Sequence, residues 1–300
     1  MTSPAPRPIG VDATGTVAAT SAQVGQIRNL VYEECGIFIP ESRFRSLEER
    51  CMRRMAVVNA TSLMQYFSFL TSRAGRAAEI KNLLNEITVG ETCFFRNQSQ
   101  LDALQNVILP ELVARKMGQG LHHVRIWSAG CSTGEEPYTL AILLIENSAG
   151  VLKNWTFEVL ASDLNENSLV KAQAGIYGDY ALRNVKGYYL NKYFEREGDL
   201  YRVKREVRSQ VRFSRINLLD DSRMVFMKGM DVIFCCNVLI YFDTASKRRV
   251  VQHFYNNLLA DSHLFLGHAE SLFGVSEDFK LVHYPTATGY LKSQKVMAGR

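Results

Sequence analysis

Apolar residues in the first third of the chain recur every three or four positions. The first such stretch contains Val24, Ile27, Leu30, Val31 and Cys35, and a later one contains Ile80, Leu83, Leu84 and Ile87. This spacing places the apolar side chains on one face of a helix. Gly36 follows the first stretch as a stop signal. The pattern predicts a small bundle of four short helices as the N-terminal domain, over residues 21–90.

Further along the chain, apolar runs of strand length alternate with helical stretches. Strands are predicted over 124–129, 157–162, 211–216, 231–236 and 263–267, and helices over 136–147, 166–174 and 244–259. This alternation is typical of an α/β domain with a mostly parallel sheet covered by helices. A further helix over 98–117 is expected to be interrupted or kinked at Pro110, because proline breaks the backbone hydrogen-bond ladder.

Three stretches depart from this rhythm. Residues 176–210 are polar, basic and rich in tyrosine, with a turn signal at Glu197-Gly198-Asp199, which predicts an inserted antiparallel β-subdomain with a hairpin over 194–202. Residues 279–291 are predicted to form a final pair of antiparallel strands. Residues 1–20 are rich in Ala, Thr, Pro, Ser and Gly and are expected to be a disordered tail. The large α/β domain therefore covers residues 91–300.

Composition narrows the class of protein. Of the 300 residues, 47% are hydrophobic and 22% are charged, which is typical of a globular chain and excludes a fibre. A net charge of +5 is too mild to indicate nucleic acid as a partner. Apolar runs fall short of the roughly 18 residues of a membrane span, and the N-terminus has no signal-peptide pattern. We expect a soluble, monomeric protein without membrane insertion.

Cysteine and histidine spacing gives no metal site. The six cysteines stand at positions 35, 51, 93, 131, 235 and 236, with no C-x-x-C pair and no Cys/His cluster at zinc-ligand spacing. Reduced, mostly buried thiols of this kind indicate a cytoplasmic protein.

The first candidate site is the stretch Gly130–Tyr138, between a predicted strand and a predicted helix. Its glycines allow the backbone to approach a ligand, and the helix N-terminus offers free N–H groups. However, Glu135 and Glu136 stand where a pyrophosphate would lie, and two carboxylates repel phosphate and suit a cationic ligand. A phosphate-binding P-loop is excluded because no Gly-Lys-Ser/Thr follows.

Two further strands end in polar residues. Asp163 follows the strand over 157–162, where a carboxylate either caps the next helix or accepts both hydrogen bonds of a ribose diol. Its place relative to the glycine loop favours the ribose. Asn237 follows the most apolar strand, and ligands of open α/β sheets sit at the carboxyl ends of such strands. A nucleoside with a positive charge and no phosphate fits this set, as in S-adenosylmethionine.

Six strings, spread over nearly the whole chain, resemble the chemotaxis receptor methyltransferases of the CheR type. They are TVGETCFFR (88–96), WSAGCSTGEEPY (127–138), ASD (161–163), INLL (216–219), CNVLIYF (236–242) and GHAES (267–271). The resemblance implies a class I S-adenosylmethionine methyltransferase domain behind an N-terminal helical domain. It also implies methyl transfer from S-adenosylmethionine to glutamates of chemoreceptors, which gives γ-methyl esters used in sensory adaptation.

The resemblance also implies the site residues. Thr92 and Arg96 would touch the methionine carboxylate side of the cofactor, Glu135 would lie near the sulfonium and amino group, and Asp163 would hold the ribose. Asn217 and Leu218 would frame the adenine, and Asn237 and Val238 would line the methionine end. Gly90 and Gly130 complete the cofactor set. Arg96 and Tyr241 would orient the incoming carboxylate.

Two positions depart from the family pattern. Some members have Asn where Gly90 stands, so one cofactor contact is missing here or is made by the backbone. The hairpin over 194–202 is shorter than in members that dock on a receptor's C-terminal pentapeptide, which predicts recognition independent of that peptide. The mechanism needs no general base, because a glutamate is already ionised at neutral pH.

A helix predicted over 41–55 is rich in arginine. It carries Arg43, Arg45, Arg50, Arg53 and Arg54 beside Glu41, Glu48 and Glu49. In one interpretation these side chains form a solvent-exposed face with ion pairs between residues four apart. In the other, the helix docks the acidic methylation helices of receptors through Arg43, Arg50, Arg53 and Arg54. Two other functions stay open: an RNA methyltransferase that uses the basic stretch 186–215, and a non-catalytic docking module.

Overall fold

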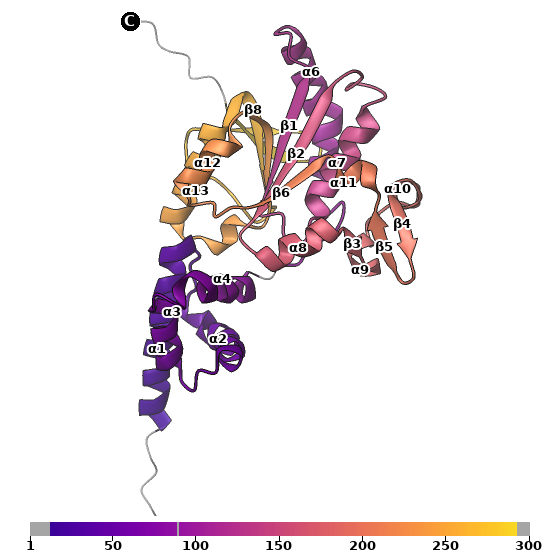
Figure 1. The fold of residues 1–300 in the computed structure, drawn as a ribbon. Coiled ribbons are helices and arrows are strands. Elements are labelled where there is room, and N and C mark those ends of the chain that lie inside the picture. The colour runs from indigo at the N-terminus through magenta and orange to yellow at the C-terminus, as the bar shows by residue number, and fades with distance from the viewer. Residues whose placement is uncertain (1–12, 89, 293–300) are drawn as a thin grey trace, which may run out of the picture. The chain divides into compact units, whose positions relative to one another are not determined.

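The computed structural model describes residues 13–88 and 90–292 (Figure 1). The chain forms two compact units. The first comprises Met1–Glu34 and Phe38–Ile87, and the second comprises Cys35–Ile37 and Thr88–Arg300. The short piece at 35–37 joins the second unit, where Ile37 forms an isolated antiparallel bridge with Phe242.

The described part of the first unit is helical. It contains α1 (Ala13–Cys35), a 3-10 turn (Glu41–Arg43), α2 (Phe44–Val58), α3 (Leu63–Thr71) and α4 (Arg76–Ile87). Ser62 caps α3 by accepting a hydrogen bond from the Gln65 N–H, and α2 ends at Asn59 in the left-handed conformation. Leu47, Tyr66, Leu70 and Leu83 are almost completely buried in its core.

The predicted disordered tail needs correction. Helix α1 begins at Ala13, so the prediction is wrong for residues 13–20, whereas residues 1–12 lie outside the described residues. The stretch extends the amphipathic part of α1, and adding residues to an existing helix avoids the cost of nucleation although Gly15 and the threonines favour a helix weakly. Composition does not reveal such an extension, because it depends on the helix that follows.

The second unit is built on a seven-stranded sheet in the order β6-β2-β1-β7-β8-β10-β9. The strands are β1 (His123–Ala129), β2 (Thr156–Asp163), β6 (Val211–Arg215), β7 (Met230–Cys235), β8 (Leu258–Leu266), β9 (Lys280–His283) and β10 (Thr288–Lys292). The first five strands in this order are parallel, and β10 runs antiparallel to both of its neighbours. The mostly parallel sheet predicted from the sequence is therefore confirmed.

Helices cover both faces of this sheet. The longer ones are α7 (Glu135–Asn147), α8 (Glu166–Ala174) and α13 (Thr244–Asn257), with a short α12 (Asp221–Met224) beside α13. Figure 1 shows α7 and α13 on opposite sides of the strands. None of the described helices combines the length and the apolarity that crossing a bilayer requires.

The helix before β1 is interrupted just ahead of Pro110. It consists of α5 (Gln98–Ala103), a π-helical turn (Leu104–Ile108) and α6 (Leu109–Met117), with Pro110 in the first turn of α6. Proline has no N–H to donate to the carbonyl four residues earlier, so the ladder changes its pitch at this point.

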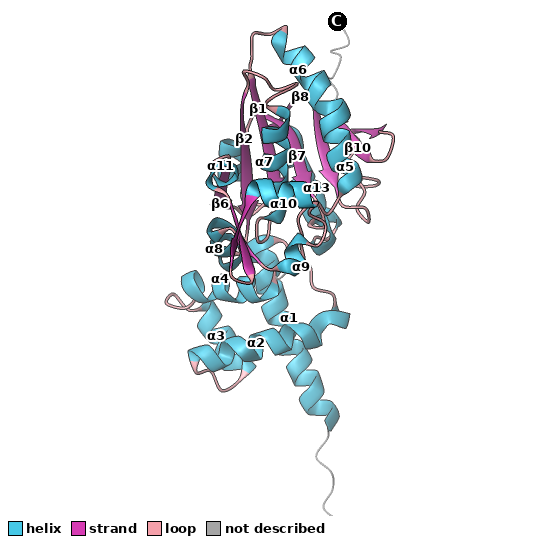
Figure 2. Ribbon diagram, turned by 90° about the vertical axis from the view of Figure 1, so that its right-hand side faces the viewer, coloured by secondary structure: helices cyan, strands magenta, loops and turns pink. Residues whose placement is uncertain are grey.

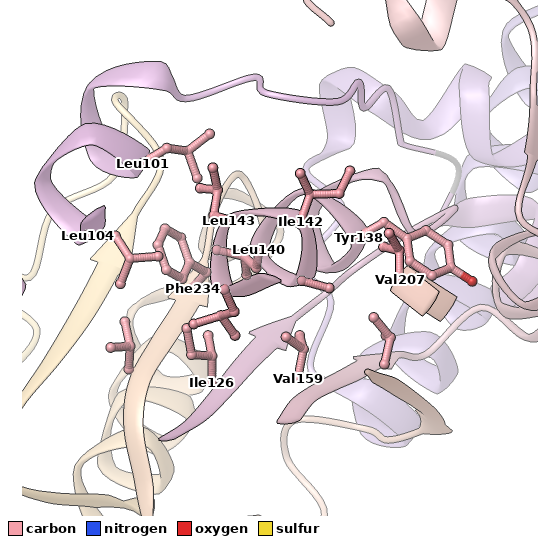
Figure 3. Close-up of a cluster of buried hydrophobic side chains, with 14 of the residues drawn as sticks. Leu101, Leu104, Ile126, Tyr138, Leu140, Ile142, Leu143, Val159, Val207 and Phe234 are labelled. Atoms are coloured by element: carbon pink, nitrogen blue, oxygen red, sulfur yellow. The ribbon is translucent and has the colours of Figure 1, made fainter. Parts of the chain in front are cut away.

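The core of the second unit lies between α7 and the sheet. Leu140, Ile142 and Leu143 project from α7, and Ile126, Val159 and Phe234 project from β1, β2 and β7 (Figure 3). All six are at most 1% exposed. Burying each such side chain contributes roughly 1.5–3 kcal/mol, so the strands that carry the polar loops are held rigidly.

The stretch that departs from the alternation forms a small antiparallel sheet of its own, as predicted. Its order is β3 (Ile176–Tyr177), β5 (Leu200–Val203) and β4 (Phe194–Glu197). The short helices α9 (Asp179–Leu182), α10 (Gly187–Tyr193) and α11 (Arg205–Arg208) accompany it. The β4–β5 hairpin turns on Gly198 and Asp199, and Gly198 has φ 63°, which suits the first position of a tight two-residue turn.

Candidate functional site

A cavity of about 330 Å³ opens at the carboxyl ends of the parallel strands, which is within the size range of ligand pockets. Its walls come from the loops after β1, β2, β6 and β7 and from the segment before α5. Ten of the predicted site residues line it: Gly90, Thr92, Arg96, Gly130, Asp163, Asn217, Leu218, Asn237, Val238 and Tyr241.

Glu135 is the exception among the predicted cofactor residues. It does not line the cavity, whereas its neighbour Glu136 does. Glu135 is 4% exposed, and its Oε2 accepts a hydrogen bond of 2.7 Å from Thr133 Oγ1. Consecutive residues of a helix point about 100° apart, and of these two glutamates Glu136 is the one turned toward the cavity. The structure therefore assigns the ligand-facing position to Glu136.

The loop after β1 approaches the cavity so closely that glycine is required. Gly130 has φ +81°, and a Cβ placed there would lie 2.3 Å from Val238 Cγ2. The next turn contains Ser132 at φ 48°, a conformation that is uncommon for a residue with a side chain. This geometry turns the Ser132 N–H toward Asp163, whose Oδ2 accepts it at 2.8 Å.

Asp163 is held by backbone donors but keeps acceptor capacity. Its Oδ1 accepts from the Asn165 N–H at 2.8 Å. The N-cap of α8 is Asn165, whose side chain accepts from Ser168 N, so Asp163 does not cap this helix. Burial raises the pKa of Asp163, and the backbone hydrogen bonds oppose that rise. A carboxylate has about four lone-pair sites, so Asp163 is still able to accept a hydrogen bond from a ligand.

Glu270 shapes the loop after β7, a role that sequence reasoning missed. Its Oε2 accepts from the Asn237 N–H at 2.8 Å and from the Gly267 N–H at 2.7 Å, and its Oε1 accepts from the Ile240 N–H at 3.1 Å. One carboxylate thus holds Asn237 at its unusual φ of 62°. Glu270 belongs to the string at 267–271, whose resemblance to the family carries the signal for this role.

A second carboxylate faces the cavity at the start of α7. Glu136 Oε1 accepts a hydrogen bond of 2.7 Å from Ser128 Oγ. Burial raises the pKa of Glu136 to about 7, although the hydrogen bond from Ser128 opposes the rise. A nearby cationic ligand would favour the ionised form of this carboxylate.

Arg96 is the single basic side chain among the described residues that line the cavity. Its Nη1 donates to the Glu91 carbonyl at 2.7 Å, and its side chain is exposed. Tyr241 lies half-buried in the same lining, and no hydrogen bond of its hydroxyl group is found within the described residues. Both groups are thus able to bind a carboxylate that enters the cavity.

The balance of charge in the cavity fits the predicted cofactor. Glu91, Glu136 and Asp163 supply three carboxyl groups beside the one guanidinium of Arg96. The Glu91 carboxylate is paired with Tyr180 and Arg183, whereas Glu136 and Asp163 lie in the lining without a basic side-chain partner among the described residues. S-adenosylmethionine carries a sulfonium and an ammonium, and an acidic lining suits these two positive charges. Across residues 13–88 and 90–292, no group of three or more His, Cys, Asp and Glu side chains is arranged to hold a metal ion.

The predicted docking arginines divide into two kinds. Arg54 forms a two-point ion pair with the buried Glu79, at 2.9 and 2.7 Å, and Arg50 donates to the Ile87 carbonyl at 2.9 Å. These two side chains tie α2 to α4, which favours an internal role for them over docking. Arg43 is exposed, and Arg53 is 58% exposed despite an ion pair with Glu86.

Comparison with known proteins matches both units. The family model described as "CheR methyltransferase, SAM binding domain" covers residues 90–288, and the one described as "CheR methyltransferase, all-alpha domain" covers residues 22–88. Chemotaxis protein methyltransferase 2 of Vibrio cholerae is 35% identical over 93% of this chain and 96% of its own length. The chemotaxis protein methyltransferase of Borreliella burgdorferi is 34% identical over 85% and 90%, and that of Escherichia coli is 32% identical over 89% and 91%.

Proposed function

The chain belongs to the CheR methyltransferase family, and from this premise we propose that it methylates glutamate side chains of chemoreceptors, forming γ-methyl esters. It is a methyltransferase with S-adenosylmethionine as cofactor. The observation that carries the choice of a carboxylate substrate is Arg96. This side chain is the one cation found among the described cavity residues, and Tyr241 lies in the same lining.

The cofactor would be held by groups that lie at successive strand ends. Asp163 would accept hydrogen bonds from the ribose, and Asn217 with Leu218 would frame the adenine. Glu136, rather than Glu135, would attract the positive charges of the methionine part. When bound, the cofactor supplies an electrophilic methyl group on its sulfonium.

The residues of the chain would align and partly desolvate the nucleophile. A glutamate carboxylate is ionised at neutral pH, so it needs no base before it attacks the methyl carbon in line with the leaving sulfur. Opposite charges disappear in this step, and a site that excludes water therefore favours it. Arg96 and Tyr241 would orient the incoming carboxylate. The Asn-Val-Leu-Ile-Tyr run at 237–241 also lacks the Pro-Pro pair that is typical of many amine methyltransferases.

The proposal is tested with methyl-labelled S-adenosylmethionine and the purified cytoplasmic fragment of a chemoreceptor. We expect protein-bound label that mild alkali releases as methanol, because esters hydrolyse under conditions that leave N-methyl groups intact. A fragment whose methylatable glutamates are replaced by alanine is the control and should remain unlabelled. Label that is stable to alkali, or that appears on RNA, would contradict the proposal.

We further propose that the acidic methylation helices dock on the exposed arginines of α2 and its preceding turn. Arg43 and Arg53 are the members of the predicted set whose side chains are open to solvent. Exchanging both for glutamate should raise KM for the receptor fragment by about tenfold and leave kcat nearly unchanged, because rim charges affect encounter more than chemistry.

The matched control for docking is Arg212→Glu, which reverses another exposed arginine, on β6. It should leave KM unchanged at the same ionic strength, whereas a pure loss of kcat in the Arg43/Arg53 double variant would contradict docking.

Recognition is proposed to be independent of a C-terminal receptor pentapeptide, because β4 and β5 span four residues each and meet in a two-residue turn. A receptor fragment without its last five residues should therefore show the same KM.

A further inference from the structure

The segment from Glu91 to Arg96, which brings Thr92 and Arg96 to the cavity, is attached to the inserted β-subdomain. The Phe94 N–H donates to the Ala181 carbonyl at 3.0 Å. The Phe94 ring meets Tyr177 and Phe194 edge-on, with ring centres 4.9 and 5.1 Å apart. The central residue of the segment therefore packs between β3 and β4.

The first residue of the segment is attached to the same subdomain. The Glu91 carboxylate accepts hydrogen bonds from the Tyr180 hydroxyl and, at 3.1 Å, from Arg183. The guanidinium of Arg183 lies 4.0 Å from the centre of the Tyr180 ring, which adds a cation–π contact. The hydrogen bond from Tyr180 also lowers the pKa of Glu91. The start of the segment is thus fixed by α9 and the residue just after it.

The third attachment involves a strained residue. Phe95 has φ 53°, which is an outlier for a bulky side chain. Its N–H donates to Thr139 Oγ1 at 3.1 Å, and its ring stacks on Tyr189 of α10, with centres 5.0 Å apart and planes 12° apart. Strained backbone of this kind persists only where the surroundings over-determine it. Tyr189 supplies the broad ring contact on the subdomain side.

Helix α10 is in turn fixed to the core. Tyr193 stacks beside Tyr189, and its hydroxyl donates to the carboxylate of Glu146 on α7. Lys192 Nζ reaches the same carboxylate at 2.8 Å. A continuous set of contacts therefore runs from α7 through α10 to Phe95, the residue directly before Arg96. Figure 2 shows α10 beside α7.

We propose that Tyr189 is a positioning residue of the cofactor site. Its ring holds Phe95 in the left-handed conformation, and this conformation directs Arg96 toward the cavity. The inserted subdomain is then a clamp on the cofactor-binding segment, in addition to any part it takes in receptor recognition. The inference rests on the proposed function only in that Arg96 is taken to contact the cofactor or the substrate.

The test compares Tyr189→Leu with Tyr189→Phe and with Tyr188→Leu. Tyr188 neighbours Tyr189 on α10 and is 59% exposed, its ring contacts Tyr189 and its hydroxyl contacts Glu146 and Lys192. The ring that stacks on Phe95 is that of Tyr189, so Tyr188→Leu controls for a general loosening of α10. Two quantities are measured: the Kd of S-adenosylhomocysteine by calorimetry, and amide hydrogen exchange of residues 90–97 in the ligand-free enzyme. Tyr189→Leu should raise Kd by about tenfold and speed exchange in this segment, because an aromatic contact is lost.

Rescue by the conservative variant separates positioning from general stability. Tyr189→Phe keeps the ring and should bind and exchange like the original protein, as should Tyr188→Leu. If Tyr189→Leu fails to fold, Tyr189→Met keeps most of the volume without a ring and answers the same question. Unchanged exchange over residues 90–97 in the folded variant, with unchanged Kd, would overturn the inference. The exchange measurement needs no substrate, so it stands even if receptor methylation is not found.

Discussion

Replacing Asp163 with alanine is expected to weaken the binding of S-adenosylmethionine by at least about a hundredfold, because hydrogen bonds to a charged acceptor contribute about 1.5–3 kcal/mol each and two are lost. The carboxylate already accepts the Ser132 and Asn165 N–H groups, which fix its direction at the end of β2. It would therefore meet a ribose diol without a reorganisation cost. Titration calorimetry with S-adenosylmethionine measures the change directly.

Two comparisons show whether that loss arises at the ribose. S-adenosylhomocysteine has the same ribose and no sulfonium, so its Kd should rise by the same factor. Asp163→Asn keeps one acceptor oxygen and the shape of the side chain, and it should lie between the original protein and Asp163→Ala. An alanine variant that melts normally and keeps its Kd within threefold would show that Asp163 does not hold the cofactor.

Hydrophobic periodicity was sufficient to predict the sheet of the second unit. The apolar run at 231–236 and the alternation around it led to β7 and its parallel neighbours, because buried strands are continuous in hydrophobicity. The order of the strands was not predictable, since no local pattern records which strand lies beside which. The sequence predicted an interruption of the helix at Pro110, but it did not predict that the interruption takes the form of a π-helical turn.

The site was predictable as far as strand ends and residue types determine it. Asp163 and Asn237 were found because polar residues stand directly after apolar strands. Which of Glu135 and Glu136 faces the cavity was not predictable from the sequence, because it depends on how packing in the core rotates α7 about its axis. Glu270 was missed for a related reason: its three backbone partners come from two loops that are distant in sequence.

The arginines of α2 show the same limit for charged residues. A sequence gives their spacing but not their partners, and Arg54 resembles any exposed arginine until Glu79 is placed beside it. Glu79 is 3% exposed and also accepts a hydrogen bond of 2.8 Å from the Tyr66 hydroxyl. The pair is therefore part of the core of the first unit, and a docking test that reversed Arg54 would measure unfolding instead.

Replacing Lys116 with methionine is expected to destabilise the second unit by about 3–5 kcal/mol, because it leaves a buried carboxylate without its counter-charge. Lys116 Nζ lies 2.6 Å from Asp231 Oδ2 and also donates to the His123 carbonyl. The two side chains are 8% and 0% exposed. Asp231 Oδ1 has no hydrogen-bond partner among the described residues, so this carboxylate already depends on few contacts. A loss of this size lowers the melting temperature by roughly 10 °C in a domain of this length.

The origin of the loss is separable by adding a second change. In the original protein the Arg125 N–H donates to Asp231 Oδ2 at 2.9 Å. Asp231→Asn removes the buried charge but keeps an acceptor oxygen for this N–H. The double variant Lys116→Met, Asp231→Asn should therefore be more stable than Lys116→Met alone, as denaturant unfolding would show. Arg212→Met removes a 77% exposed arginine from Glu158, which keeps Arg125 as a partner, and should change stability by less than about 1 kcal/mol. If the double variant were no more stable than Lys116→Met, the loss would come from packing of the lysine stem and not from the uncompensated charge.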